Sequence, residues 1–321
     1  MKLVVSSPPH WRVKLRESNI HRDFIIALLP ALIFAVYTYG MFAVRVISLA
    51  AAAALLSDVL IRKLFRKPAT FTDGSALLIG LLFGLLMPPG VPYWVVIIGA
   101  FLCIFIGKEI FGGLGSSPLN PVLVGWTIIA ISWPAYVNFS LSTAHYNLGL
   151  DFQYPLIMLK NGGAGFVSDF RLIDLLLGKQ VGGMGAAAVL FLLAGGLYLL
   201  LRRVVTWEIP LSFAAGVLIM SGIFWAANSE VYANPLFHLL TGNVMIGIFF
   251  LSTDYSSSPF NKWSMVAFGL GCGFLTVIFR AWGIEPDGVI FAILIMNLFT
   301  PLLDKLKKQP RPLQVSYMEK R

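Results

Sequence analysis

The chain has 321 residues, of which 58% are hydrophobic and 12% charged, and its mean hydropathy is +0.81. These values are typical of a chain buried in lipid and exclude an ordinary soluble domain. The net charge of +9 does not indicate a nucleic-acid-binding protein, because the basic residues fall between apolar segments instead of forming one patch. The sequence therefore predicts an all-α integral membrane protein that partners the lipid bilayer and no nucleic acid.

The apolar segments are long enough to cross the hydrocarbon core as helices, which takes about 17–20 residues. Ten transmembrane helices are predicted, at 24–40, 43–61, 74–90, 92–108, 120–137, 184–201, 209–226, 236–252, 264–281 and 285–303. An even number places both termini on one side of the membrane. All but five of the 24 lysines and arginines then fall on that side, which the positive-inside rule identifies as cytoplasmic. The basic run from Arg62 to Lys67 is interpreted as a solvated part of this signal.

The chain divides into two similar halves around a long polar segment. The predicted parts are a cytoplasmic N-terminal segment (1–22), a first five-helix repeat (23–137), an outside, periplasmic loop segment (138–183), a second five-helix repeat (184–304) and a basic cytoplasmic tail (305–321). Polar turns open corresponding spans in the two halves, Asp73-Gly74-Ser75-Ala76 in the first and Gly242-Asn243-Val244-Met245 in the second. Because transporters built from such repeats bind their ligands at the repeat interface, function is expected there.

Three carboxylates, Asp73, Asp254 and Asp287, lie closest to the predicted membrane interior. Carboxylates at that depth are costly and are usually paired, hydrated or functional. Asp73 and Asp254 fall at equivalent places in the two repeats. The sequence leaves two roles open for both residues, helix capping and cation access. Arg280 and Glu285 are expected to form a pair at the outside surface, where such a pair contributes little.

The sequence predicts neither a metal site nor a catalytic residue. Cys103 and Cys272 are two isolated thiols inside predicted spans, and they cannot supply the four ligands of an iron–sulfur cluster. No Gly-x-Gly-x-x-Gly fingerprint follows a strand, so the chain is not expected to bind a dinucleotide. Any redox role would therefore depend on partner subunits.

Six motifs occur in order along nearly the whole chain: Ser7-Pro8-Pro9-His10, Ile26-Ala27-Leu28-Leu29-Pro30-Ala31, Asp73-Gly74-Ser75-Ala76, Phe111-Gly112-Gly113-Leu114-Gly115 with Asn120-Pro121, Ser252-Thr253-Asp254 with Ser258-Pro259, and 287–297. Together they resemble the RnfD/NqrB family, the large membrane subunits of the Rnf complex and of the sodium-pumping NADH:quinone oxidoreductase. The length of the chain favours the RnfD branch.

The resemblance implies a membrane flavoprotein of the bacterial cytoplasmic (inner) membrane. It would relay electrons across the membrane within an Rnf-type translocase, coupled to Na+ or H+ transport. Its partners would be the other Rnf-type membrane, flavin and iron–sulfur subunits. The family's cofactors are a riboflavin held without a covalent bond near the cytoplasmic side and an FMN attached through its phosphate to a threonine of the outside loop. By itself such a subunit would not be a complete enzyme.

For riboflavin, Asn120 matches one asparagine of the family's Asn-Pro-x-Asn-Pro segment and Ser117 replaces the other. Asp73, Gly74 and Asp254 are expected on the same, cytoplasmic side. A serine hydroxyl can still donate and accept hydrogen bonds, so the exchange weakens the match without removing it. The alternative is that Ser117 and Asn120 merely cap the fifth helix.

For FMN, the resemblance to the family's Pro-Leu and Leu-Lys pattern places Tyr154, before Pro155, where the acceptor threonine should be. A second register places His145 at that position, and Thr143 is then the neighbouring hydroxyl. Neither register puts a threonine at the acceptor position, so covalent FMN is not expected, whereas non-covalent FMN stays open.

A second class of function also stays open. Passive small-solute channels and transporters can be built from repeated five-helix halves, and fold alone does not fix function. Bound flavin would distinguish the two classes, because a channel has no use for a redox cofactor.

Overall fold

The computed structural model describes residues 17–66, 73–137, 154–167 and 170–305. Within these ranges the chain is helical and contains no β-strand, so the all-α prediction is confirmed for them. The α-helices are α1 (Glu17–Tyr39), α2 (Met41–Leu64), α3 (Ser75–Leu86), α4 (Tyr93–Ile104), α5 (Pro121–Ser132), α6 (Pro134–Val137), α7 (Pro155–Gly162), α8 (Leu172–Leu176), α9 (Val189–Leu201), α10 (Glu208–Ala227), α11 (Pro235–Leu240), α12 (Val244–Ile246), α13 (Lys262–Trp282) and α14 (Val289–Lys305). Two π-helical segments, Phe105–Glu109 and Gly247–Leu251, continue α4 and α12.

Four helices, α1, α2, α10 and α13, are long and apolar enough to cross a membrane. Large apolar side chains project outward from them: Ile33, Leu56 and Leu211 are 68%, 63% and 64% exposed. Large apolar side chains exposed on long apolar helices suit lipid and not water. The chain is a multi-pass membrane protein.

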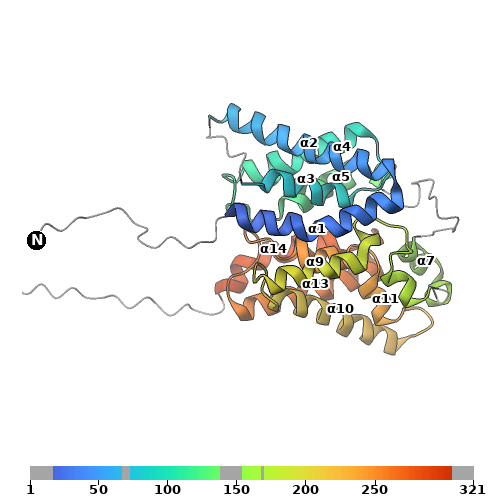
Figure 1. Ribbon diagram of the computed structural model, residues 1–321. Helices are drawn as coiled ribbons and strands as arrows, with labels where there is room; N and C mark the ends of the chain where they lie inside the picture. The colour runs from blue at the N-terminus through green and yellow to red at the C-terminus, as the bar shows by residue number, and fades with distance from the viewer. Residues whose placement is uncertain (1–16, 67–72, 138–153, 168–169, 306–321) are drawn as a thin grey trace, which may run out of the picture.

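The helices of the two halves lie on opposite sides of the bundle. Figure 1 shows α2 to α5 on one side of α1, and α9, α10, α13 and α14 on the other. α1 packs against α9, α2 against α3 and α4, and α10 against α13. We call the end of the bundle where α1 begins and α14 ends, on the left in Figure 1, the proximal end, and the end where α1 gives way to α2 the distal end.

Small residues let neighbouring helices approach closely. A Cβ atom on Gly80 of α3 would lie 2.8 Å from the Ala50 carbonyl oxygen of α2, and one on Gly273 of α13 would lie 2.5 Å from the Val217 nitrogen of α10. Helices in lipid gain little hydrophobic driving force from one another, so close van der Waals packing stabilises their association.

Several of the predicted spans are shorter or broken in the structure, among them the third span, the fifth span and the span at 236–252. α3 ends at Leu86 because Pro88 and Pro89 carry no N–H to continue it, so its helix is about 18 Å long. The predicted span at 236–252 is interrupted after α11 by the turn Thr241–Asn243, and α12 with its π-helical segment follows. Such interruptions are tolerated at membrane depth where protein surrounds them or where they line a cavity.

Candidate functional site

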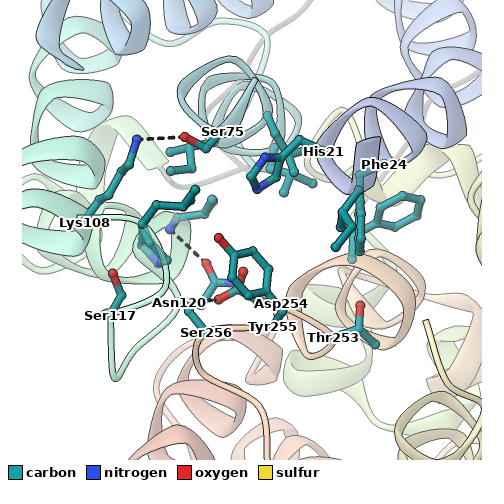
Figure 2. A pocket seen from close by; sticks show the side chains of 18 of the residues that line it. His21, Phe24, Ser75, Lys108, Ser117, Asn120, Thr253, Asp254, Tyr255 and Ser256 are labelled. Carbon is teal, nitrogen blue, oxygen red and sulfur yellow. Dashed lines mark hydrogen bonds between the residues drawn. The ribbon is translucent and has the colours of Figure 1, made fainter. Parts of the chain in front are cut away.

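A narrow cavity lies at the proximal end, between α1, α3, α5 and the turn after the second π-helical segment. We call it the proximal cavity; its volume is about 100 Å³. Apolar side chains such as Phe24, Leu82 and Phe250 form much of its wall. The polar side chains that line it are His21, Ser75, Lys108, Ser117, Asn120, Thr253, Asp254, Tyr255 and Ser256. Figure 2 shows His21 and Ser75 facing Tyr255 and Asp254 across this space.

Lys108 is a fully buried cation at the edge of the proximal cavity, with 1% of its surface exposed. Its Nζ atom donates to Asp58 Oδ1 at 2.8 Å and to Ser75 Oγ at 2.8 Å. The second of these bonds joins the π-helical end of α4 to the first residue of α3, as the dashed line in Figure 2 shows. A buried ammonium needs such partners, because removing it from water is costly.

Arg62 of α2 joins the same network. Its guanidinium lies 2.9 Å from Asp58, 3.6 Å from Asp73 and 3.6 Å from Glu109. Two cations, Arg62 and Lys108, therefore face three carboxylates. Arg62 is 8% exposed, so its interpretation as a solvated residue is wrong. The nearby carboxylates account for its inward position.

Asn120 uses both ends of its amide. Its Oδ1 accepts from the Val122 N–H at 2.9 Å, which caps α5, and its Nδ2 donates to the Leu251 carbonyl oxygen at 2.9 Å. Capping, the simpler alternative, is thus observed for Asn120, and the same side chain also ties the first half of the chain to the second. Ser117 is 2% exposed and lines the cavity beside it.

The remaining predicted proximal residues lie on or directly behind the cavity wall. Asp254 lines the cavity and accepts from Ser256 Oγ at 2.5 Å and from Ser257 Oγ at 3.2 Å. Burial raises the pKa of Asp254, and these hydrogen bonds oppose that change. Asp73 and Gly74 lie behind the wall: the Asp73 carbonyl oxygen accepts from His21 Nδ1 at 2.6 Å, and Gly74 adopts φ +70° just before α3.

A second and larger cavity, of about 480 Å³, lies at the distal end; we call it the distal cavity. Tyr154 lines it directly before Pro155 begins α7, and it is 6% exposed. Burial, with a smaller contribution from the negative charge of Asp287, raises the pKa of its phenol. Thr143 and His145 lie outside the described residues.

A buried ion pair closes the break between α11 and α12. Arg280 donates to the carbonyl oxygens of His238 at 2.6 Å and Thr241 at 2.8 Å, and to Asp287 Oδ1 at 3.1 Å. Asp287 Oδ2 in turn accepts from the Asn243 N–H at 2.6 Å. The expected surface pair of Arg280 with Glu285 is wrong, because Arg280 is 6% exposed and its carboxylate partner is Asp287. Free helix ends at the break need a donor and an acceptor, and this pair supplies both.

Comparison with known proteins identifies the family. The model of the NQR2, RnfD, RnfE family matches residues 4–312. The chain belongs to this family. The D component of the Na(+)-translocating ferredoxin:NAD(+) oxidoreductase complex of Acetobacterium woodii is 35% identical over 313 residues, which cover 96% of this chain and 95% of that protein.

Two further relatives in the family carry similar names. The D component of the proton-translocating ferredoxin:NAD(+) oxidoreductase complex of Clostridium ljungdahlii is 35% identical over 308 residues, covering 94% of this chain and 93% of that protein. The D component of the ion-translocating oxidoreductase complex of Ectopseudomonas mendocina is 33% identical over 323 residues, covering 95% of this chain and 94% of that protein. The resemblance to the RnfD/NqrB family is therefore confirmed.

The family motifs did not lead to every buried polar group of the site. The motifs led to Asn120, Ser117 and Asp254, which the structure brings to one cavity. They did not lead to Lys108, although it falls inside the predicted span 92–108. A charged residue within a predicted span is itself a sign of a buried pair or of function, and it would have singled out Lys108.

Proposed function

We propose that this chain is the D-type membrane component of an Rnf-type ion-translocating oxidoreductase complex. It relays electrons through a flavin held without a covalent bond in the proximal cavity, coupled to Na+ or H+ transport, with the other Rnf-type subunits as partners. The names of the relatives support the complex and the transport. The observation that carries the flavin site is the proximal cavity, whose wall combines apolar side chains with hydroxyl, amide and charged groups that could bind the polar edge of a flavin ring.

The residues of the proximal cavity suit such a ring. Phe24, Leu82 and Phe250 would exclude water from its faces. Within the described residues Lys108 uses two of its three donors, so one ammonium proton and the Ser117 hydroxyl are available there for ring oxygen or nitrogen atoms. When bound, the flavin would supply electron transfer. Burial raises the pKa of Asp254, so this carboxyl beside the ring is easier to protonate than an exposed one.

The cavity must widen to admit a three-ring ligand. Its volume of about 100 Å³ is small beside the 480 Å³ of the distal cavity. The non-helical parts of the wall lie in the loop 114–120, at Val204 and in the turn Thr253–Ser256, so displacement of these parts opens the space at less cost in hydrogen bonds than displacement of a helix.

The distal cavity does not fit the family's covalent FMN. The acceptor position holds Tyr154, whose hydroxyl is several ångströms further from the backbone than a threonine oxygen and whose ring is buried. We therefore assign no electron-transfer step to a phosphoester-linked flavin at Tyr154.

The purified full-length chain is expected to carry a flavin that denaturation releases. After denaturation the flavin should appear in the supernatant, and the protein band should show no fluorescence under ultraviolet light. Leu82→Trp, which fills the proximal cavity, should reduce the flavin content at least tenfold, whereas Leu197→Trp on the exposed face of α9 should leave it unchanged. A colourless wild-type chain would favour the channel alternative, and a fluorescent band of added FMN mass would overturn the non-covalent assignment.

We also propose ten crossings arranged as two inverted repeats. In each half a basic residue near the end of one helix holds the start of a short helix: Lys108 binds Ser75 of α3, and Arg280 and Asp287 hold Asn243 before α12. α3, α4 and α5 then correspond to α12, α13 and α14, with opposite orientation in the membrane. This layout keeps the proximal end cytoplasmic and the distal end outside.

Reporter fusions should show this topology. A reporter joined after Arg321 should report the cytoplasm, and one inserted near Asn161, in α7 at the distal end, should report the outside, because the charge bias places the basic termini inside. A cytoplasmic signal from the insertion near Asn161 would contradict the ten-span arrangement.

A further inference from the structure

At the distal end of α3, a backbone carbonyl has no hydrogen-bond donor among the described residues. Pro88 and Pro89 follow the helix and carry no N–H. The Leu85 carbonyl oxygen accepts from the Gly185 N–H at 2.7 Å. Within the described residues, no hydrogen bond reaches the Leu86 carbonyl oxygen. A buried carbonyl in this state costs free energy unless water or an ion satisfies it.

A second buried oxygen without a partner lies beside it. Asn243 is 1% exposed, and its backbone N–H is bound to Asp287 Oδ2. Its side-chain Oδ1 receives no hydrogen bond from any described residue. Asn243 also lines the distal cavity, so this position has a route to the distal surface.

The three oxygens converge at Gly183, in the segment that leads to α9. A Cβ atom built on Gly183 would lie 3.3 Å from Asn243 Oδ1, 3.3 Å from the Leu85 carbonyl oxygen and 3.3 Å from the Leu86 carbonyl oxygen. The missing side chain thus leaves room next to oxygens from both halves of the chain.

At the proximal end, the carbonyl oxygen that ends the other short helix does have a side-chain donor. There the carbonyl oxygen of Leu251, which ends the second short helix, accepts from Asn120 Nδ2. At the distal end the corresponding position before α14 holds Asp287, an acceptor that serves the Asn243 N–H. The last carbonyl of α3 therefore gains no side-chain donor, and the negative end of the α3 dipole favours positive charge at this point.

We propose that Leu85 O, Leu86 O and Asn243 Oδ1 bind a partly dehydrated alkali cation with the chemistry of Na+. Oxygen ligands suit hard cations, and the absence of a carboxylate from this set of three favours a monovalent over a divalent ion. Carbonyls at the end of a short membrane helix coordinate Na+ in other transporter folds. As a place on an ion path the site rests on the proposed function, but its cation binding can be measured without electron transfer.

The test uses the full-length chain in detergent, with NaCl compared with choline chloride at equal ionic strength. Because a ligand that binds the folded state stabilises it, Na+ should raise the Tm saturably by about 2–4 °C at ten times Kd. Equilibrium dialysis with radioactive sodium should show one ion per chain. Equal Tm values in NaCl and choline chloride, with no retained sodium, would overturn the proposal.

Substitutions at Gly183 and Asn243 test whether Na+ binds at the three oxygens. Gly183→Ala places a methyl group at the convergence point, and Asn243→Ala removes one ligand, so each should weaken Na+ binding at least tenfold. Gly222→Ala is the matched control, since its Cβ would meet only Pro235 Cγ at an ordinary 3.8 Å. Because Gly183→Ala could disturb folding, Asn243→Asp provides a second test: it keeps the shape, adds charge and should tighten binding several-fold.

The outcomes separate this site from the proposed function. Wild-type Na+ binding in both Gly183→Ala and Asn243→Asp would overturn the site, whatever the flavin content. Loss of flavin from Leu82→Trp with Na+ binding intact would leave the site standing, as would a wild-type chain that lacks flavin but binds Na+.

Discussion

Replacing Arg280 by methionine is expected to lower the free energy of unfolding by about 3–5 kcal/mol, because removing one member of a buried ion pair leaves the other charge uncompensated. Arg280 and Asp287 are 6% and 7% exposed. The change would also leave the carbonyl oxygens of His238 and Thr241 without the donor that holds them. The break between α11 and α12 should then open first, and thermal unfolding in detergent should show a lower Tm.

Glu285→Gln is the matched control for Arg280→Met. Glu285 is partly exposed and lies two residues before Asp287, yet no ion pair within the described residues joins it to Arg280. A partly solvated carboxylate contributes little, so its neutralisation should cost less than about 1 kcal/mol. Equal losses in the two variants would contradict the buried Arg280–Asp287 pair and restore the surface pair predicted from the sequence.

Composition and apolar run length were enough to predict the fold class. Segments such as 43–61 and 209–226 coincide with α2 and α10 because lipid requires a continuous apolar helix of that length. The sequence singled out the polar turn that begins at Gly242, yet the span 236–252 was predicted as one helix. The residues on both sides of the turn are apolar, and a hydropathy pattern does not distinguish a helix from two joined pieces. The break at this turn depends on Arg280, which lies 39 residues from Thr241 in sequence.

The sequence pointed to several residues of the proximal cavity, but it did not predict the hydrogen bonds that join distant parts of the chain there. Asn120 stood out through its position before Pro121, and the helix cap it forms is local. Its bond to Leu251 joins residues 131 positions apart, and the bond from Lys108 to Asp58 joins residues 50 apart. Such pairs follow from how helices pack, which one sequence does not contain as a local pattern.

Replacing Lys108 by methionine should also lower the free energy of unfolding by about 3–5 kcal/mol, because the change leaves Arg62 alone against two buried carboxylates, Asp58 and Glu109, and the partly buried Asp73. Lys63→Met is the control: Lys63 belongs to the same basic run as Arg62 but is exposed, so its loss should change stability by no more than about 0.5 kcal/mol. Thermal unfolding of the two variants in one detergent gives the comparison.

A double-mutant cycle tests whether Lys108 acts through its charge. Asp58→Asn removes the carboxylate that lies 2.8 Å from Lys108 Nζ, so in the Lys108→Met background it should restore part of the lost stability, with a coupling of about 0.5–3 kcal/mol. If the two losses simply added, the cost of Lys108→Met would come from packing. A coupled result means that the wall of the proximal cavity is stabilised by charge balance, so any ligand there meets an ammonium group held in place by Asp58 and Ser75.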